Sequence, residues 1–528
     1  MKMRMLSRHI IILLVTVLAV TGVCHAQFFK AATATDPTLF LPTPYPDESN
    51  PYWAQDIYCH YESKKDRDSI YVDAIKLVTY DYRSTSESMP RTYFINHLKF
   101  FQHSFGLTLN GSTNVALFNF LDSCRMSSNQ MLTLIPESWY RTRPCVRLRE
   151  ATFGTFRTAQ NYYYNYASSP NNSFPSNETT YGWLTSMIMS CLNPWSADTI
   201  LASGMRHGWL RHVSGVMWYS DINTSRQLGT VAFAQLMSMP KFRTRLRSMQ
   251  VTTSALLGHA DYAATINELL TNDTLIAKMA SIIPPIGDER HGEYMSDMAW
   301  YQALKPLRDS LATGDLLGSG ILDVENALDA VHPVLGININ PNQTPCLYYL
   351  YRSLENCCEQ LCDLVSERSP QRRRPYDLFG HPPYTLENLS ELEGYSSYPS
   401  LKASTGLATS LLISMVVPSR RDTLLQIGYQ YGLYRAIAGT SWYSDIDAGR
   451  VTGCLALAII ASGSDFIDLL EEARQEYVER HDHIITEVTG VKTDSVNAPN
   501  QLFTIDGRPA TPHSRGILVG KGHKVFVP

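Results

Sequence analysis

Charged residues are scarce in this sequence, and they do not gather into a basic cluster. Asp, Glu, Lys and Arg make up 18% of the 528 residues, and the formal net charge is -4. A nucleic-acid-binding protein concentrates lysine and arginine on one face or in one segment. We therefore expect no nucleic-acid partner. The hydrophobic share of 44% is large enough to fill real cores, and the length favours more than one domain.

Apolar runs long enough to cross a bilayer, about 20 residues, are absent beyond the N-terminal segment. That segment has the pattern of a secretory signal, with Lys2, Arg4 and Arg8 before an apolar stretch at 10–23 and a small-residue cleavage site. We expect residues 1–26 to be a signal peptide, cleaved after Ala26. The mature chain is then exported without a transmembrane anchor, and is periplasmic, attached to the cell surface or secreted.

Histidine and cysteine do not occur at metal-binding spacing. Cys357, Cys358 and Cys362 share one short helical stretch, but no partner residues complete a zinc site. We therefore expect neither a metal nor a cofactor. The ten cysteines include Cys24, so an odd number, nine, remains in the mature chain. Export permits disulfides, but at least one thiol must stay unpaired or pair with another molecule, and the simplest role of the others is as small buried residues.

One phrase occurs twice in the chain. WYSDINTSR at 218–226 returns as WYSDIDAGR at 442–450. Four further pairs of segments match in the same order, and the first of them joins DIYCHYESKKDRDS (56–69) to DMAWYQALKPLRDS (297–310) without a gap. The repeated region is far longer than the repeat of a solenoid. The sequence therefore predicts two copies of one domain.

Apolar residues in each copy recur at helical spacing, as with Leu407 and Leu411, whereas alternating strand patterns are scarce. The predicted fold class is all-α, with two tandem helical domains and Pro- and Gly-rich connections. The first copy is placed at 40–250 and the second at 281–480, with a helical linker at 251–280. Because duplication supplies matching surfaces, we expect the copies to pack as an internal pseudo-dimer.

The last segment, 500–528, has a different pattern. Its short alternating apolar runs are broken by Asp-Gly, Pro and Gly, which predicts a β-hairpin. The segment resembles the C-terminal sorting tails of proteins exported by type IX secretion, which often end in a Gly-x-Lys-Val-like strand, here GHKV at 522–525. An ordinary C-terminal strand that pairs with the body is the alternative interpretation.

Both copies carry an Arg-Pro pair, then Pro-Ser, then an Arg followed ten residues later by Asp. In the second copy these are 374–375, 399–400, Arg435 and Asp445. The pattern resembles the class A non-specific acid phosphatases of the type-2 phosphatidic-acid-phosphatase and vanadium-haloperoxidase superfamily. Their three motifs are Lys-x6-Arg-Pro, Pro-Ser-Gly-His and Ser-Arg-x5-His-x3-Asp. The resemblance implies a helical, exported, metal-independent phosphomonoesterase.

The chemistry of that family assigns a role to each motif position. The Lys, both Arg, the Ser and backbone amides stabilise the negative charge of the phosphoryl group. One His attacks phosphorus, and the Asp behind it fixes its tautomer and orientation. The second His protonates the leaving oxygen. The Gly lets the backbone approach the oxyanion closely.

The second copy lacks both histidines. By resemblance, it keeps Arg374, Ser400 and Arg435 as phosphate-binding positions and Asp445 as the orienting carboxylate. The remaining motif positions hold Glu367 for the lysine, Leu401 for the glycine, Lys402 for the acid histidine, Tyr434 for the serine and Ser441 for the nucleophile.

The first copy lacks both histidines as well. It keeps Arg143, Ser176 and Arg211 at the phosphate-binding positions, and Asp221 at the orienting position. The remaining positions hold Pro136 for the lysine, Asn177 for the glycine, Glu178 for the acid histidine and Met217 for the nucleophile. Consequently no residue of either copy is assigned a catalytic role.

Substitute groups do not fit the family's geometry. His212 adjoins Arg211, but neighbouring residues on a helix point about 100° apart. His207 precedes Arg211 by four residues and His381 follows Arg374 by seven, and we expect these histidines to be ordinary surface or core residues. A Ser441 nucleophile with Lys402 as its base is not the family's arrangement.

Two functions are open. The favoured one is a catalytically silent, acid-phosphatase-like protein that binds a phosphorylated or other anionic small molecule. The alternative is an active acid phosphatase with an altered or residual site. The retained arginines and serines either still bind an oxyanion or persist because they hold the fold together. Vanadate-dependent peroxidase activity is disfavoured, because that cousin family binds vanadium through the equivalent histidine.

Overall fold

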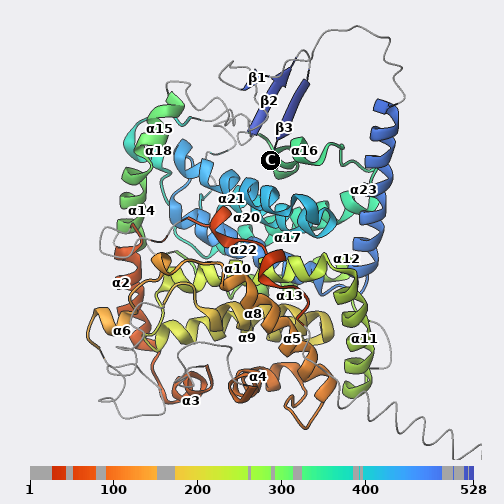
Figure 1. Cartoon of the computed structure of the whole chain (residues 1–528). Coiled ribbons are helices and arrows are strands. Elements are labelled where there is room, and N and C mark those ends of the chain that lie inside the picture. The colour runs from red at the N-terminus through yellow and green to blue at the C-terminus, as the bar shows by residue number, and fades with distance from the viewer. Residues whose placement is uncertain are drawn as a thin grey trace, which may run out of the picture. The chain divides into compact units, whose positions relative to one another are not determined.

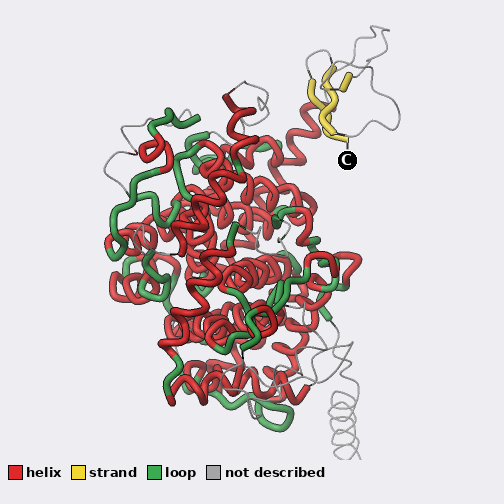
Figure 2. Tube along the Cα trace, turned by 90° about the vertical axis from the view of Figure 1, so that its left-hand side faces the viewer, coloured by secondary structure: helices red, strands yellow, loops and turns green. Residues whose placement is uncertain are grey.

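The computed structural model describes most of the chain after the predicted signal, and residues 1–26 lie outside the described residues. Those described are 27–42, 44, 51–78, 91–150, 173–259, 263–286, 292–312, 324–384, 392, 396–489, 503–504, 516–520 and 523–527. They fall into two units, one that runs to Val478 and another that begins at Glu479. Every regular element described within the first unit is a helix (Figures 1 and 2), which confirms the all-α prediction.

The helices of unit 1 follow one another with short connections. Those up to residue 280 are α2 (Trp53–Glu62), α3 (Ser69–Val78), α4 (Arg91–Phe105), α5 (Val115–Leu132), α6 (Pro144–Arg147), α8 (Asn177–Leu192), α9 (Ala197–Val213), α10 (Tyr219–Met237), α11 (Pro240–Leu257), α12 (Ile266–Leu270) and α13 (Asp273–Ala280). Those after it are α14 (Gly292–Ala303), α15 (Lys305–Ala312), α16 (Ala327–Leu335), α17 (Pro345–Glu367), α18 (Pro375–Phe379), α20 (Leu401–Val416), α21 (Arg421–Ala438), α22 (Tyr443–Ala461) and α23 (Phe466–Thr489), which continues into unit 2. Short 3-10 turns are η1 (Ala31–Thr33), η2 (Pro37–Leu39), η3 (Ser63–Asp66), η4 (Glu137–Trp139), η6 (Pro194–Ser196) and η8 (Pro418–Arg420).

Four helices, α8, α10, α20 and α22, form the centre of unit 1 (Figure 1). They are buried on every side, as expected of helices made of apolar and small residues all round. Two glycines permit the closest approach. A Cβ at Gly449 would lie 2.3 Å from the carbonyl oxygen of Ser400, and one at Gly453 would lie 2.4 Å from that of Ser404. The N-terminal end of α20 is therefore held directly against α22.

Among the described helices, only one bent pair has the length and composition for a membrane crossing. No single described helix is long and apolar enough to cross a bilayer. The pair formed by α22 and the first part of α23 meets the criterion only jointly, across a bend of 101°, and α22 is a buried core helix.

Segments that match in the sequence repeat pack against each other. Helix α2 lies along α14, and the backbone N–H of Gln55 donates to the Ser296 hydroxyl at 2.8 Å. These two residues immediately precede 56–69 and 297–310, so they occupy equivalent positions in the alignment.

Two further contacts between α2 and α14 form an exchanged pair. The Cys59 thiol lies 4.0 Å from a carboxylate oxygen of Glu293, and the Tyr52 ring packs edge-on against Trp300 with centroids 5.3 Å apart. In the sequence alignment Cys59 is equivalent to Trp300, and Tyr52 to Glu293. Each contact therefore recurs with the two segments exchanged, which is the pattern of a two-fold interface.

Unit 2 contains the predicted hairpin. Strand β2 (Gly516–Gly520) pairs antiparallel with β3 (His523–Val527), with Leu518 opposite Val525. A two-residue strand, β1 (Phe503–Thr504), pairs with the other edge of β2. The alternating apolar residues therefore form strands as predicted, and Figure 2 shows these strands in yellow.

The nine described cysteines, from Cys59 to Cys454, are free thiols. Eight of them are buried, and Cys346 is half-buried. The eight buried thiols serve as small core side chains, and burial raises the pKa of Cys357 and Cys362. Cys24 lies outside the described residues.

Candidate functional site

A buried arginine underlies the predicted site of the second copy. Arg372 donates to a carboxylate oxygen of Asp445 at 3.0 Å and also to Asp297. Burial alone would lower the pKa of Arg372, but the two carboxylates raise it. Ser444 completes the cluster, since its hydroxyl and its backbone N–H donate to the two oxygens of Asp297 at 2.7 and 2.8 Å.

Asp445 also fixes the start of α22. It accepts a hydrogen bond from the backbone N–H of Trp442 at 2.7 Å, three residues earlier. The indole N–H of Trp442 donates to the carbonyl of Arg373 at 2.8 Å, which ties α22 to the Arg-Pro segment. Burial raises the pKa of Asp445, although Arg372 opposes that rise.

The region predicted to be the first copy contains a matching cluster. Arg141 donates to Asp56 at 2.8 Å and to Asp221 at 2.6 Å. Ser220 donates to Asp56 through both its hydroxyl and its N–H, and Trp218 donates its indole N–H to the carbonyl of Thr142 at 2.8 Å. The two clusters, which we call the arginine frames, therefore consist of matched residues.

Asp56 and Asp297 were not among the predicted site residues. They lie far along the chain from the arginines that they bind. The sequence repeat could have pointed to them, because each aspartate is the first residue of its copy of the first repeated segment, 56–69 or 297–310.

The loop between α21 and α22 gathers the predicted phosphate-binding residues of the second copy. Arg374 donates to the carbonyl of Thr440 at 2.7 Å, and the N–H of Ser441 donates to the carbonyl of Arg435 at 3.2 Å. Ser400 is the N-cap of α20, and its backbone N–H donates to the carbonyl of Asp445 at 2.9 Å. Arg374 and Arg435 thus meet at this loop with Ser441, and Ser400 lies against the first turn of α22.

The cationic ends of this site converge on one short segment. Arg435 is 1% exposed, and its guanidinium donates to the carbonyl of Val324 at 3.5 Å. Lys402 donates to the carbonyl of the next residue, Glu325. Glu367, at the lysine position of the family motif, is exposed at the C-terminal end of α17.

In the first copy a carboxylate already contacts the equivalent arginine. Glu178 lies 3.4 Å from the guanidinium of Arg211, which also donates to the carbonyl of Val78 at 3.0 Å. Arg143 donates to the carbonyl of Val216 at 3.1 Å. Ser176 caps α8, and its hydroxyl accepts from the N–H of Thr179. The resulting site pairs an arginine with a carboxylate at the position of the family's acid histidine.

Buried side chains without an imidazole fill both nucleophile positions. Ser441 is 5% exposed and Met217 is 1% exposed. The Met217 sulfur lies 3.6 Å from the Arg143 guanidinium, so a thioether occupies the place where the family's imidazole would stand.

The three histidines considered from the sequence lie in different surroundings. His207 is buried against Phe101 and His97, and burial lowers its pKa well below the usual value. His212 contacts the carbonyl of Met217 through Nδ1 at 3.0 Å, and burial lowers its pKa to about 4. His381 is exposed and lines a surface cavity with Tyr301 and Arg308.

The chain is similar to several acid phosphatases, and each of these matches covers part of both chains. Over 160 residues the chain is 30% identical to a non-specific acid phosphatase of Salmonella typhimurium, a match that covers 30% of this chain and 64% of that protein. Over 213 residues it is 27% identical to the non-specific acid phosphatase of Providencia stuartii, covering 40% of this chain and 84% of that protein. An acid phosphatase of Zymomonas mobilis is 30% identical over 105 residues, which are 20% of this chain and 40% of that protein.

The chain thus spans just under two thirds of the length of the Salmonella protein. No protein-family model matches it. These matches show that the chain is similar to acid phosphatases.

Proposed function

We propose that this protein is an exported acid-phosphatase-like protein built from two degenerate copies of one domain. Neither copy performs phosphohistidine chemistry, and the second copy binds a phosphate-bearing or other anionic ligand. The observation that carries the proposal is the combination of two preserved arginine frames with Ser441 and Met217 at the nucleophile positions.

Three observations support duplication. The two arginine frames use matched residues, and α2 and α14 make exchanged contacts. The 213-residue match to the Providencia phosphatase has the length of one predicted copy.

Catalytic silence is supported by the chemistry of the replacements. A thioether is neither a phosphate nucleophile nor a general base. A serine hydroxyl needs an adjacent base to attack phosphorus, and the Lys402 ammonium is directed to the carbonyl of Glu325. Loss of a covalent nucleophile lowers rates by orders of magnitude.

Anion binding by the second copy is supported by its charge. The Arg374 guanidinium contacts the loop between α21 and α22, and the Arg435 and Lys402 side chains contact the adjacent carbonyls of Val324 and Glu325. Guanidinium and ammonium donors suit a tetrahedral oxyanion. An entering anion would replace the carbonyls of Val324 and Glu325 as the hydrogen-bond acceptor of the Arg435 and Lys402 side chains.

A residual acid phosphatase activity is the second candidate. The observation in its favour is that both arginine frames retain the carboxylates, Asp221 and Asp445, that orient the nucleophile in active relatives by resemblance. The named relatives are themselves acid phosphatases.

An assay of the mature full chain on 4-nitrophenyl phosphate at mildly acidic pH separates the two candidates. We expect hydrolysis no faster than that of the double variant Arg374→Ala, Arg435→Ala. The matched control is Arg245→Ala, because Arg245 is an exposed arginine on α11. Turnover that is retained in the control and lost in the double variant would establish the active enzyme.

A further inference from the structure

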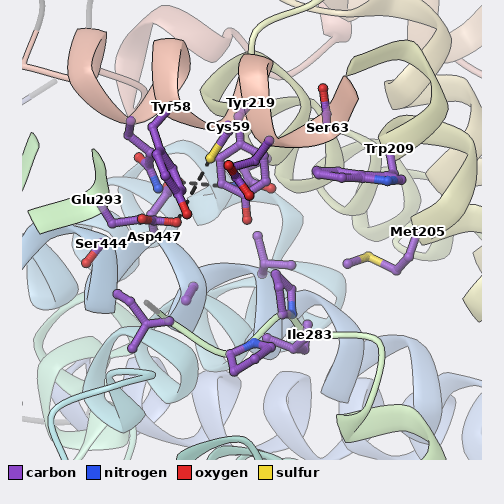
Figure 3. A pocket seen from close by; sticks show the side chains of 18 of the residues that line it. Tyr58, Cys59, Ser63, Met205, Trp209, Tyr219, Ile283, Glu293, Ser444 and Asp447 are labelled. Carbon is purple, nitrogen blue, oxygen red and sulfur yellow. Dashed lines mark hydrogen bonds between the residues drawn. The ribbon is translucent and has the colours of Figure 1, made fainter. Parts of the chain in front are cut away.

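A cavity of about 320 Å³ lies between the two halves of unit 1 (Figure 3). Its walls come from α2, α9 and α10 on one side and from α14, α22 and residues 283–286 on the other. The residues of the predicted phosphate sites are not among those that line it. Its volume falls within the range of small-molecule sites.

The counterpart of this cavity across the pseudo-two-fold axis is filled. There Trp300 stacks on Tyr443 with centroids 3.8 Å apart and ring planes within 6°, and Tyr52 packs edge-on against both. By the sequence alignment, the equivalent positions on the cavity side hold Cys59, Tyr219 and Glu293. A thiol thus replaces an indole and a carboxylate replaces a phenol, which leaves space and adds negative charge.

A third replacement adds to the difference in packing between the cavity and its filled counterpart. Tyr429, on the filled side, donates its hydroxyl to Gln227 and covers the guanidinium of Arg450, 4.4 Å from its ring centre. Its equivalent on the cavity side is Met205, which lines the cavity. The open site is therefore a property of one side only.

The cavity has an acidic end. Glu293 and Asp447 lie on the same side in Figure 3. Asp447 is 6% exposed, and its two oxygens accept only long hydrogen bonds, 3.4 Å from Asn223 and 3.5 Å from Gln227. The one buried cation of the lining, Arg226, donates to the Asn223 side chain and to the carbonyl of Met205.

The opposite end is aromatic and apolar. Trp209 and Met205 lie across the cavity from the carboxylates in Figure 3. The Trp209 indole N–H donates to Asp66 at 3.2 Å, which orients the ring, and at the rim Glu62 pairs with Lys65 at 2.6 Å. Glu62 and Lys65 therefore compensate each other, and Asp66 adds one negative charge to those of the inner carboxylates.

We propose that this cavity binds a small organic monocation with a ring-sized apolar body, its ammonium group directed to Glu293 and Asp447 and its ring packed against Trp209. An ammonium group forms charge-assisted hydrogen bonds with carboxylates, and aromatic faces attract cations and apolar rings. An anion would meet the two carboxylates, and a larger ligand would exceed the volume. The inference does not depend on what binds at the phosphate sites.

Calorimetric titration of the mature chain with 2-phenylethylammonium tests the proposal, with 2-phenylethanol as the neutral analogue of the same shape. The amine should bind at least about tenfold more tightly than the alcohol, and Glu293→Gln should weaken its binding by about tenfold. Quenching of tryptophan fluorescence by the amine should disappear in Trp209→Phe. The matched control is Glu137→Gln, which removes an exposed carboxylate on η4 and should leave amine binding unchanged.

Filling the cavity provides the complementary test. Cys59→Trp introduces the residue found at the equivalent filled position and should abolish amine binding. Met205→Tyr, which copies Tyr429, tests the same point if the first variant does not fold. Equal affinity for amine and alcohol, binding that persists in a folded filled variant, or absence of amine binding at millimolar concentration would each overturn the proposal.

Discussion

The side-chain amide of Asn223 donates to the carboxylate of Asp447 at 3.4 Å, where α10 packs against α22. Each residue directly follows one occurrence of WYSDI, so positions that match in the sequence repeat touch each other in space. That is the relationship found near the axis of a two-fold dimer. The difference between amide and carboxylate at this contact also makes the interface asymmetric, and the asymmetry gives the cavity its acidic end.

The arginine frames are predicted to be major stability determinants. Arg372→Ala leaves Asp297 and Asp445 buried without their shared cation, and loss of one partner from a buried ion pair costs about 3–5 kcal/mol. Arg141→Ala should have a comparable effect, because Asp56 and Asp221 are buried in the same way. Urea unfolding of each variant measures the change.

The matched control for this prediction is Arg352→Ala, which removes a 54% exposed arginine from its pair with Glu355. An exposed pair contributes at most about 1 kcal/mol. If the three variants unfold at the same urea concentration, the frames do not hold the fold together.

Acidification is predicted to destabilise the protein through its buried histidines. Burial lowers the pKa of His97 to about 3 and that of His212 to about 4, against about 6.5 in an unfolded chain. Because the folded-state pKa values are depressed, the unfolded chain binds protons first as the pH falls. Stability is therefore lost from about pH 6.5 downward, by up to about 1.4 kcal/mol per pH unit for each such histidine.

Unfolding at pH 7 and at pH 5 tests this dependence. His97→Gln can still contact Thr185 but takes up no proton, so the stability difference between the two pH values should shrink. His381→Gln changes an exposed imidazole and should leave that difference as it is in the parent chain. A pH dependence that is unaltered by His97→Gln would contradict the assignment.

Export is predicted from both ends of the chain. The mature N-terminus should lie near Gln27, as N-terminal sequencing of the secreted or periplasmic protein would establish. If the hairpin at 500–528 is a sorting signal, its deletion should trap the protein in the periplasm. Surface location or secretion that survives the deletion would leave β2 and β3 as ordinary strands.

Local patterns were sufficient for the secondary structure. Three- and four-residue apolar spacing indicated the helices, and alternation around Asp-Gly and Gly turns indicated β2 and β3. The motif residues of the second copy were also predicted to share one site, and the structure places Arg374 and Arg435 at one loop and Ser400 against the first turn of the helix that follows it.

Contacts between distant segments were not accessible from these patterns. The arginine frames depend on Asp56 and Asp297, whose partners lie tens of residues away, and nothing in their immediate neighbourhood marks them as ion-pair partners. The cavity depends on which residues face each other across the interface. The exchange of Trp300 for Cys59 is visible in the alignment, but its effect requires the register of α2 against α14.

The last prediction is that phosphate binding differs between the two copies. In the first copy Glu178 lies 3.4 Å from Arg211, so a carboxylate occupies the vicinity of the arginine that would bind the anion. In the second copy Lys402 stands at the equivalent motif position. Titration of the mature chain with inorganic phosphate should therefore reveal one site. Arg435→Ala should lower the phosphate affinity of that site about tenfold or more, and Arg435→Lys is the comparison variant that keeps the positive charge.

Glu178→Gln should then create a second phosphate site. The substitution removes the negative charge beside Arg211 and preserves the size of the side chain, so the calorimetric stoichiometry should rise from one to two. Glu137→Gln removes an exposed carboxylate elsewhere on the same half and should leave the stoichiometry at one. If phosphate does not bind the parent chain, or binds equally well after Arg435→Ala, the retained arginines act only in packing and the anion-binding proposal fails.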